Sequence, residues 1–76
     1  MEKVIEILKS IRSDVDYENE KALIDDGILD SFDVVSIVGE LTDAYDIEIS
    51  IDDMIPENFN SVEAIQNMIT RILDED

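Results

Sequence analysis

A serine between two aspartates is the residue of this chain best placed to do chemistry. Asp30-Ser31-Phe32-Asp33 lies where an irregular segment ends and a run of regularly spaced apolar residues begins. Asp30 is a favourable N-cap and Asp33 a first-turn acid, so the spacing predicts a helix whose first residue is Ser31. A helix N-terminus offers free N–H groups and a partial positive charge, which both stabilise a phosphate. The Ser31 hydroxyl is therefore a candidate attachment point for a phosphorylated group.

The helix that begins at Ser31 is predicted to end near Tyr45. Its apolar residues recur at a spacing of three and four, which is typical of a helix with one buried face. The residues expected on that face are Val34, Ile37, Val38, Leu41, Ala44 and Tyr45.

A first helix and a long loop are predicted before it. The helix should cover residues 2–13 and the loop residues 14–29, which is longer than most connections in small domains. The residues expected to be buried by the helix are Val4, Ile5, Ile7, Leu8 and Ile11, and those expected to anchor the loop are Leu23, Ile24, Ile28 and Leu29.

Two further helices are predicted after an extended connection over residues 46–50. A short one should span residues 51–55 and stop at Pro56, which cannot continue a helix. The last should begin with a capping box formed by Asn60 and Glu63. Its expected core residues are Val62, Ile65, Met68, Ile69, Ile72 and Leu73. The pattern predicts an all-α fold: one domain over residues 1–76, built as a small four-helix bundle with a long first loop and a short third helix.

Composition excludes several classes of protein. The chain has no cysteine and no histidine, which removes disulfides, thiolate nucleophiles and the usual general base. It shows no apolar run of membrane-spanning length and no signal-peptide pattern, so we expect a cytoplasmic protein. We also expect the protein to be a monomer.

The net charge of −16 is the second informative property. Between Ala22 and Thr70 there are twelve carboxylates and no basic residue. Such a surface repels nucleic acid and anionic membranes, and it attracts proteins with basic patches. We expect protein partners and neither nucleic-acid binding nor membrane insertion.

Two alternatives are disfavoured by the residues themselves. Asp14, Asp16 and Glu18 alternate like the start of a calcium-binding EF-hand loop, but Asn19 stands where the loop needs glycine and Asp25 where it needs glutamate. We therefore predict no metal site. No metal-ligand cluster, glycine-rich phosphate loop or catalytic cation accompanies the carboxylates, so we predict a protein that is not an enzyme.

The segment Gly-Ile-Leu-Asp-Ser-Phe-Asp over residues 27–33 resembles the Asp-Ser-hydrophobe motif of acyl carrier proteins. The likeness extends to the order of elements over nearly the whole chain. It implies that Ser31 carries a covalent 4′-phosphopantetheine arm derived from coenzyme A, with Asp30 and Phe32 flanking it. The implied function is to hold acyl or aminoacyl groups as thioesters. The implied partners are a phosphopantetheinyl transferase, a loading ligase and downstream acyl-processing enzymes.

The resemblance leaves the cargo open. Asp33 after the motif is typical of fatty-acid carriers, so fatty acid biosynthesis and lipid metabolism are one expectation. Ser31-Phe32 is closer to D-alanyl carriers, and the segment over residues 56–60 also resembles the connection of stand-alone aminoacyl carriers. The competing class is an acidic helical adaptor whose Ser31 is never modified.

A second face of the predicted helix forms a candidate docking surface. Phe32, Val35 and Gly39 project away from the expected core, and Asp33, Glu40 and Asp43 rim them. A small apolar strip with a charged rim is typical of a transient protein interface. The alternative is that Phe32 and Val35 fold back under the loop or the third helix. Gly39 destabilises a helix by up to about 1 kcal/mol relative to alanine, so we expect another element or a partner to approach it closely.

Overall fold

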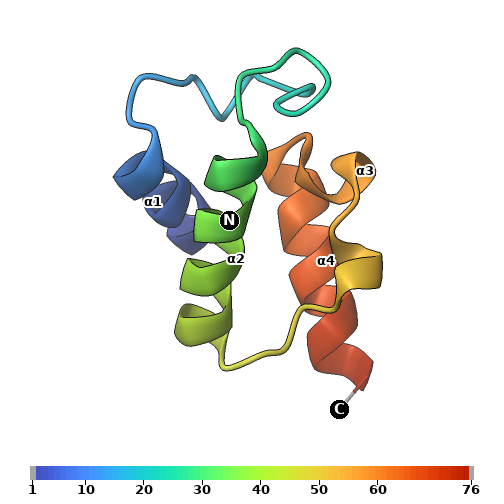
Figure 1. The fold of residues 1–76 in the computed structure, drawn as a ribbon. Coiled ribbons are helices and arrows are strands. Elements are labelled where there is room, and N and C mark those ends of the chain that lie inside the picture. The colour runs from blue at the N-terminus through green and yellow to red at the C-terminus, as the bar shows by residue number, and fades with distance from the viewer. Residues whose placement is uncertain (1, 76) are drawn as a thin grey trace.

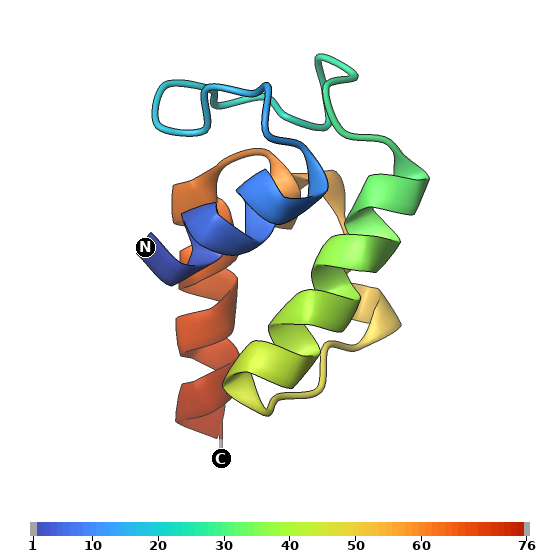
Figure 2. The same cartoon turned by 90° about the vertical axis from the view of Figure 1, so that its left-hand side faces the viewer.

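Four α-helices form an all-α bundle that a long loop crosses at one end (Figure 1). The structure, a computed structural model, describes residues 2–75 apart from the side chain of residue 75. The elements are α1 (Glu2–Ile11), α2 (Ser31–Tyr45), the 3-10 turn η1 (Ile51–Asp53), α3 (Pro56–Phe59) and α4 (Val62–Glu75). Figure 2 shows α1 lying across the space between α2 and α4. The predicted four-helix architecture is confirmed.

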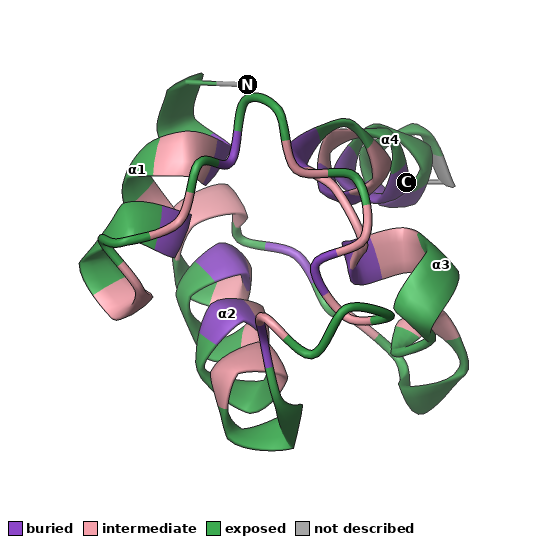
Figure 3. Cartoon of the chain, turned by 90° about the horizontal axis from the view of Figure 1, so that it is seen from above, coloured by how far each residue is buried: buried purple, intermediate pink, exposed green. Residues whose placement is uncertain are grey.

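The core lies between α1, α2 and α4 and beneath the loop, where the buried positions turn toward a common centre (Figure 3). The buried residues are Val4, Leu8, Tyr17, Leu23, Leu29, Ile37, Leu41, Ile47, Phe59, Val62, Ile65, Met68, Ile69 and Ile72. Ile24 and Ile28 are partly buried against this cluster, so the loop anchors were predicted correctly. The prediction that Leu73 belongs to the core was wrong, because its side chain is 46% exposed on α4.

The first helix ends at Ile11, two residues before its predicted end. The Tyr17 hydroxyl donates hydrogen bonds to the carbonyl oxygens of Leu8 (3.1 Å) and Arg12 (2.7 Å). Desolvation by burial raises the pKa of Tyr17, which keeps this hydroxyl protonated as a donor. Tyr17 therefore fixes the point where the chain leaves α1 and enters the loop.

The prediction for the third helix was wrong in its position. Residues 51–53 form only the 3-10 turn, and an α-helix starts at Pro56 instead of stopping there. Proline has no N–H and a helical φ, so it is well tolerated at the first position of a helix, where the N–H has no partner anyway. The same property that excludes Pro56 from a helix interior makes it a start signal.

The predicted capping box of α4 is also wrong. The backbone N–H of Ala64 donates to the Ser61 hydroxyl oxygen at 3.0 Å, so Ser61 caps this helix. The side chain of Asn60 is engaged with the loop instead, through its amide oxygen and nitrogen.

Candidate functional site

Ser31 is the first residue of α2, and its side chain is exposed. Asp30 precedes it as the N-cap and accepts a hydrogen bond at Oδ1 from the Asp33 backbone N–H (2.9 Å). The Asp30 backbone N–H donates in return to Asp33 Oδ2 (3.2 Å). This reciprocal pair is a capping box, and it confirms Asp30 as the predicted N-cap of the helix.

The cap leaves part of the helix terminus available to a ligand. Ser31 and Phe32 belong to the first turn, whose N–H groups have no acceptor within a helix. These amides and the positive end of the helix dipole favour a phosphate attached at the exposed Ser31 hydroxyl.

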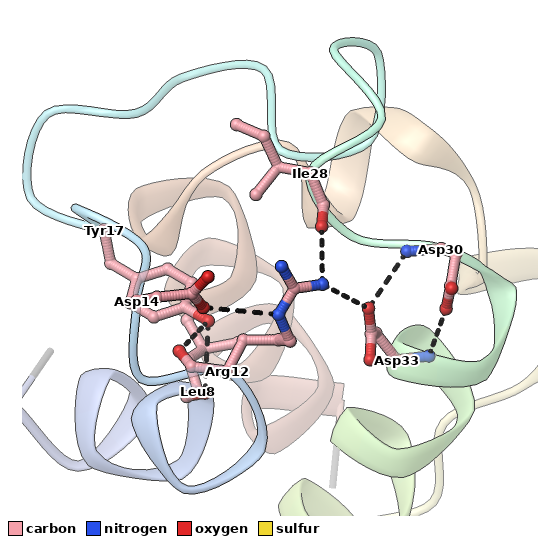
Figure 4. Close-up of polar contacts among 7 residues, drawn as sticks. All are labelled: Leu8, Arg12, Asp14, Tyr17, Ile28, Asp30 and Asp33. Atoms are coloured by element: carbon pink, nitrogen blue, oxygen red, sulfur yellow. Dashed lines mark hydrogen bonds and ion pairs between the residues drawn. The ribbon is translucent and has the colours of Figure 1, made fainter.

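Arg12 joins the end of α1 to this cap (Figure 4). Its guanidinium donates from Nη1 to the Ile28 carbonyl oxygen (3.2 Å) and to Asp33 Oδ2 (3.5 Å), and from Nε to Asp14 Oδ1 (3.4 Å). The hydrogen bond and charge of Arg12 hold the pKa of the exposed Asp14 carboxyl below its ordinary value. This contact could not be predicted from the sequence, because nothing local to Arg12 indicates that its side chain reaches Asp33.

Asp33 therefore differs from its predicted role on an exposed rim. Its side chain is only 17% exposed, and its Oδ2 is engaged by both Arg12 and the Asp30 backbone. The carboxylate stabilises the start of α2 from inside the structure. The acidic rim consists of the other two residues, Glu40 and Asp43, which are both exposed.

An apolar groove of about 490 Å³ opens beside Ser31. Asp30 and Ser31 are its polar lining residues. Its apolar walls come from the loop (Ile24, Gly27, Leu29), from α2 (Val34, Val35) and from the η1–α3 side (Met54, Ile55, Pro56, Phe59). Gly27 has a φ of +72°, the left-handed conformation that glycine adopts without strain, and this turn brings the loop back toward α2.

The second face of α2 is exposed as predicted. Phe32 is 84% and Val35 is 66% exposed, so the alternative that they fold back under another element is wrong. Gly39 lies on the same face, and a Cβ built there would meet nothing within 4 Å. No described element of this chain approaches Gly39, so that part of the expectation was wrong. Close approach by a partner protein stays a prediction.

Sequence reasoning missed a second group of exposed apolar side chains. Ile51 is 84%, Ile55 41% and Met54 38% exposed. Met54 and Ile55 line the groove from the η1–α3 side, and Ile51 is the first residue of η1. The sequence predicted a helix over residues 51–55, whereas only the 3-10 turn forms there and α3 starts at Pro56, so the exposure of these side chains was not predicted.

Few of the carboxylates are neutralised by a cation. Among the side chains of residues 2–74, ion pairs engage only Asp14 and Asp33 with Arg12, and Asp53 with Arg71 at 3.6 Å. No described helix is long and apolar enough to cross a bilayer. In the same residues, no cluster of three or more acidic side chains is arranged to hold a metal ion.

Comparison with known proteins identifies relatives along almost the whole chain, although no protein-family model matches it. The chain is 38% identical over 76 residues to the D-alanyl carrier protein of Bacillus cereus strain B4264, covering 97% of this chain and 91% of the relative. The D-alanyl carrier proteins of Bacillus cereus strain ATCC 10987 and Bacillus anthracis strain CDC 684 match with the same identity and coverage.

Proposed function

Because the chain belongs to the family of the D-alanyl carrier proteins, within the acyl carrier proteins, we propose that it carries D-alanyl groups. The group would be held as a thioester on a 4′-phosphopantetheine arm attached to Ser31. The observation that carries this proposal is the exposed serine at the first position of α2, in a chain similar to D-alanyl carriers over 97% of its length. The relatives do not support the alternative expectation of fatty acid biosynthesis and lipid metabolism.

The residues around Ser31 fit such an arm. The Ser31 Oγ would form a bond to the phosphorus that carries the pantetheine as the pyrophosphate P–O bond of coenzyme A breaks. Adenosine 3′,5′-bisphosphate would leave, and a base of the transferase would take the hydroxyl proton. The first-turn amides of α2 lie beside that position and stabilise the negative phosphate. The apolar groove offers an adjacent surface for the methyl and methylene groups of the arm. When bound, the arm supplies the thiol that this cysteine-free chain lacks.

We assign no catalytic residue to the chain itself. Asp30 fixes the helix start that presents Ser31, and Phe32 offers an apolar contact next to it. The transferase, the ligase and the acceptor enzymes would perform the chemistry, while this protein supplies attachment and recognition.

Loading experiments distinguish the proposed cargo from a fatty acyl group. The protein carrying phosphopantetheine is incubated with ATP, D-alanine and a D-alanine–carrier ligase, and in parallel with a fatty acid and an acyl-carrier synthetase. We expect one D-alanyl group per molecule by intact mass, released by hydroxylamine as a thioester should be. Loading with fatty acid in preference to D-alanine would contradict the proposed cargo.

We further propose that partner enzymes dock on the exposed face of α2. Phe32 and Val35 provide the apolar centre, Gly39 permits close approach, and Glu40 and Asp43 provide the acidic rim. Rim charges act chiefly on the rate of encounter, whereas a central aromatic side chain governs the lifetime of the complex. The expected partners therefore present a basic patch around an apolar pocket.

Modification kinetics with a basic transferase test this surface. Reversing the charge of Glu40 or Asp43 to lysine should slow the reaction about threefold or more at low ionic strength, and less as salt is added. Phe32→Ala should raise the carrier KM about tenfold at every salt concentration, as loss of about 1.4 kcal/mol of docking free energy requires. Glu6→Lys on α1 and Leu73→Ala on α4 are the matched controls, because both residues are exposed on other helices. Equal kinetics for all variants would mean that the partner docks elsewhere.

A further inference from the structure

Asn60, at the junction of α3 and α4, makes four hydrogen bonds to the loop that leads to Ser31. Its backbone carbonyl oxygen accepts from the Leu23 N–H (2.8 Å). Its side-chain Oδ1 accepts from the N–H groups of Ile24 (2.9 Å) and Asp25 (3.1 Å). Its Nδ2 donates to Asp25 Oδ2 at 3.1 Å. One side chain thus satisfies two consecutive backbone donors and a carboxylate far away in the sequence.

These hydrogen bonds connect the part of the groove lining that comes from the loop to the part that comes from α3. Ile24 and Leu29 line the groove from the loop, and Phe59, the residue before Asn60, lines it from α3. The loop is closed on itself, because the Leu29 N–H donates to the Leu23 carbonyl oxygen at 2.9 Å. Fixing Leu23 therefore also fixes Leu29, the last residue before the Asp30 cap and Ser31.

We propose that Asn60 is a positioning residue for the attachment site: it holds the loop wall of the groove in place and so orders the approach to Ser31. This inference rests on the proposed function, since its kinetic consequence is read from modification of Ser31. A partner enzyme that needs the ordered loop binds only the fastened fraction of molecules. When the hydrogen bonds of Asn60 are lost, the fraction of molecules with an ordered loop falls. The apparent KM then rises in inverse proportion to that fraction, and kcat is unchanged.

The chemistry of the amide explains why an asparagine serves here. An amide presents an acceptor and a donor at once, whereas a carboxylate presents only acceptors. In an Asn60→Asp protein one oxygen could still accept from the Ile24 and Asp25 backbones. The other would face the Asp25 carboxylate, and the two negative groups would repel each other. Replacing Asp25 by asparagine at the same time restores a donor–acceptor pair with the roles exchanged.

The test compares the parent, Asn60→Asp, and the exchanged pair Asn60→Asp/Asp25→Asn. In the unmodified protein, hydrogen exchange should accelerate at residues 23–29 in the single variant, including the three amides that bond to Asn60, while α2 and α4 stay protected. With a phosphopantetheinyl transferase, the carrier KM should rise about fivefold or more with kcat unchanged. The exchanged pair should return both readouts close to the parent values.

Two matched controls separate the fastening from net charge. Asn67→Asp makes the same substitution at an exposed position of α4. Asn60→Asp/Asp26→Asn has the net charge of the exchanged pair, with the new amide one residue away from the contact. The proposal is overturned if Asn67→Asp matches Asn60→Asp, or if the Asp26 pair recovers as fully as the Asp25 pair. If Asn60→Asp alone does not fold, the comparison of the Asp25 double variant with the Asp26 double variant still tests the proposal.

Hydrogen exchange needs no transferase, so it separates this inference from the proposed function. A parent protein that is never modified contradicts the function, while exchange at residues 23–29 still tests the fastening. A parent that is modified normally and an Asn60→Asp variant with unchanged KM and exchange contradict the role of Asn60 alone.

Discussion

Replacing Ser31 by alanine is expected to abolish attachment of phosphopantetheine and to leave the fold intact. Alanine lacks the Oγ that would form the phosphodiester. Ser31 is exposed, and the cap of α2 is formed by Asp30 and Asp33, so stability should change by no more than about 0.5 kcal/mol. Intact mass after incubation with coenzyme A and a transferase measures the first expectation, and circular dichroism during urea unfolding measures the second.

Ser36→Ala is the matched control for this loss. Ser36 is exposed on the same helix, one turn beyond the terminus, so its removal should leave modification complete. Ser61 is a poorer control because its hydroxyl caps α4. A phosphopantetheine group on the Ser31→Ala protein would show that another residue is the attachment site.

Added salt is expected to raise the melting temperature strongly. The net charge of −16 is confined to a molecule with a radius of gyration of 11.3 Å, and the described residues form only three ion-pair contacts. The screening length falls from about 30 Å at 0.01 M to about 8 Å at 0.15 M, below the size of the molecule. Removing about 1 kcal/mol of repulsion raises the melting temperature of a domain this small by about 4–8 °C.

The same experiment with a less acidic variant identifies repulsion as the cause. Glu40→Gln/Asp43→Asn removes two exposed carboxylates of α2, so it should melt higher than the parent at low salt and gain less from added salt. Millimolar magnesium should act in the same direction at lower ionic strength, by binding weakly to the folded acidic surface. A melting temperature that is flat or falling between low and moderate salt contradicts this explanation.

The start of α2 could be predicted from sequence because its signals are local. Asp30 and Asp33 cap the helix through their own backbone neighbours, and the apolar spacing after Ser31 extends to Tyr45, so the predicted and observed bounds coincide. The exposed face of α2 followed from the same helical geometry. No contact from elsewhere in the chain is needed to fix these features.

The start of α4 could not be predicted in the same way. Asn60 and Ser61 are adjacent residues that both favour an N-cap, and local preference does not choose between them. The choice follows from the loop, where the amides of Ile24 and Asp25 need an acceptor and find it in Asn60. Ser61 is then left to cap the helix.

Arg12 illustrates the same limit within the candidate site. In sequence it is a basic residue near the end of a helix, where it complements the helix dipole. In the structure it reaches Asp33 and the Ile28 carbonyl across the loop, and it changes Asp33 from an expected rim residue into a structural one. Contacts between residues distant in sequence therefore determine both the start of α4 and the role of Asp33.

The most direct test of the carrier function is to locate the modification on the parent protein. The unmodified protein is incubated with coenzyme A, magnesium and a phosphopantetheinyl transferase, and then analysed by intact mass and by fragmentation of its peptides. We expect a complete shift by one phosphopantetheine group, carried by the peptide that contains Asp30-Ser31-Phe32 and assigned to Ser31. An unchanged mass would favour an acidic adaptor that is never modified, and a group on any other residue would contradict the site proposed here.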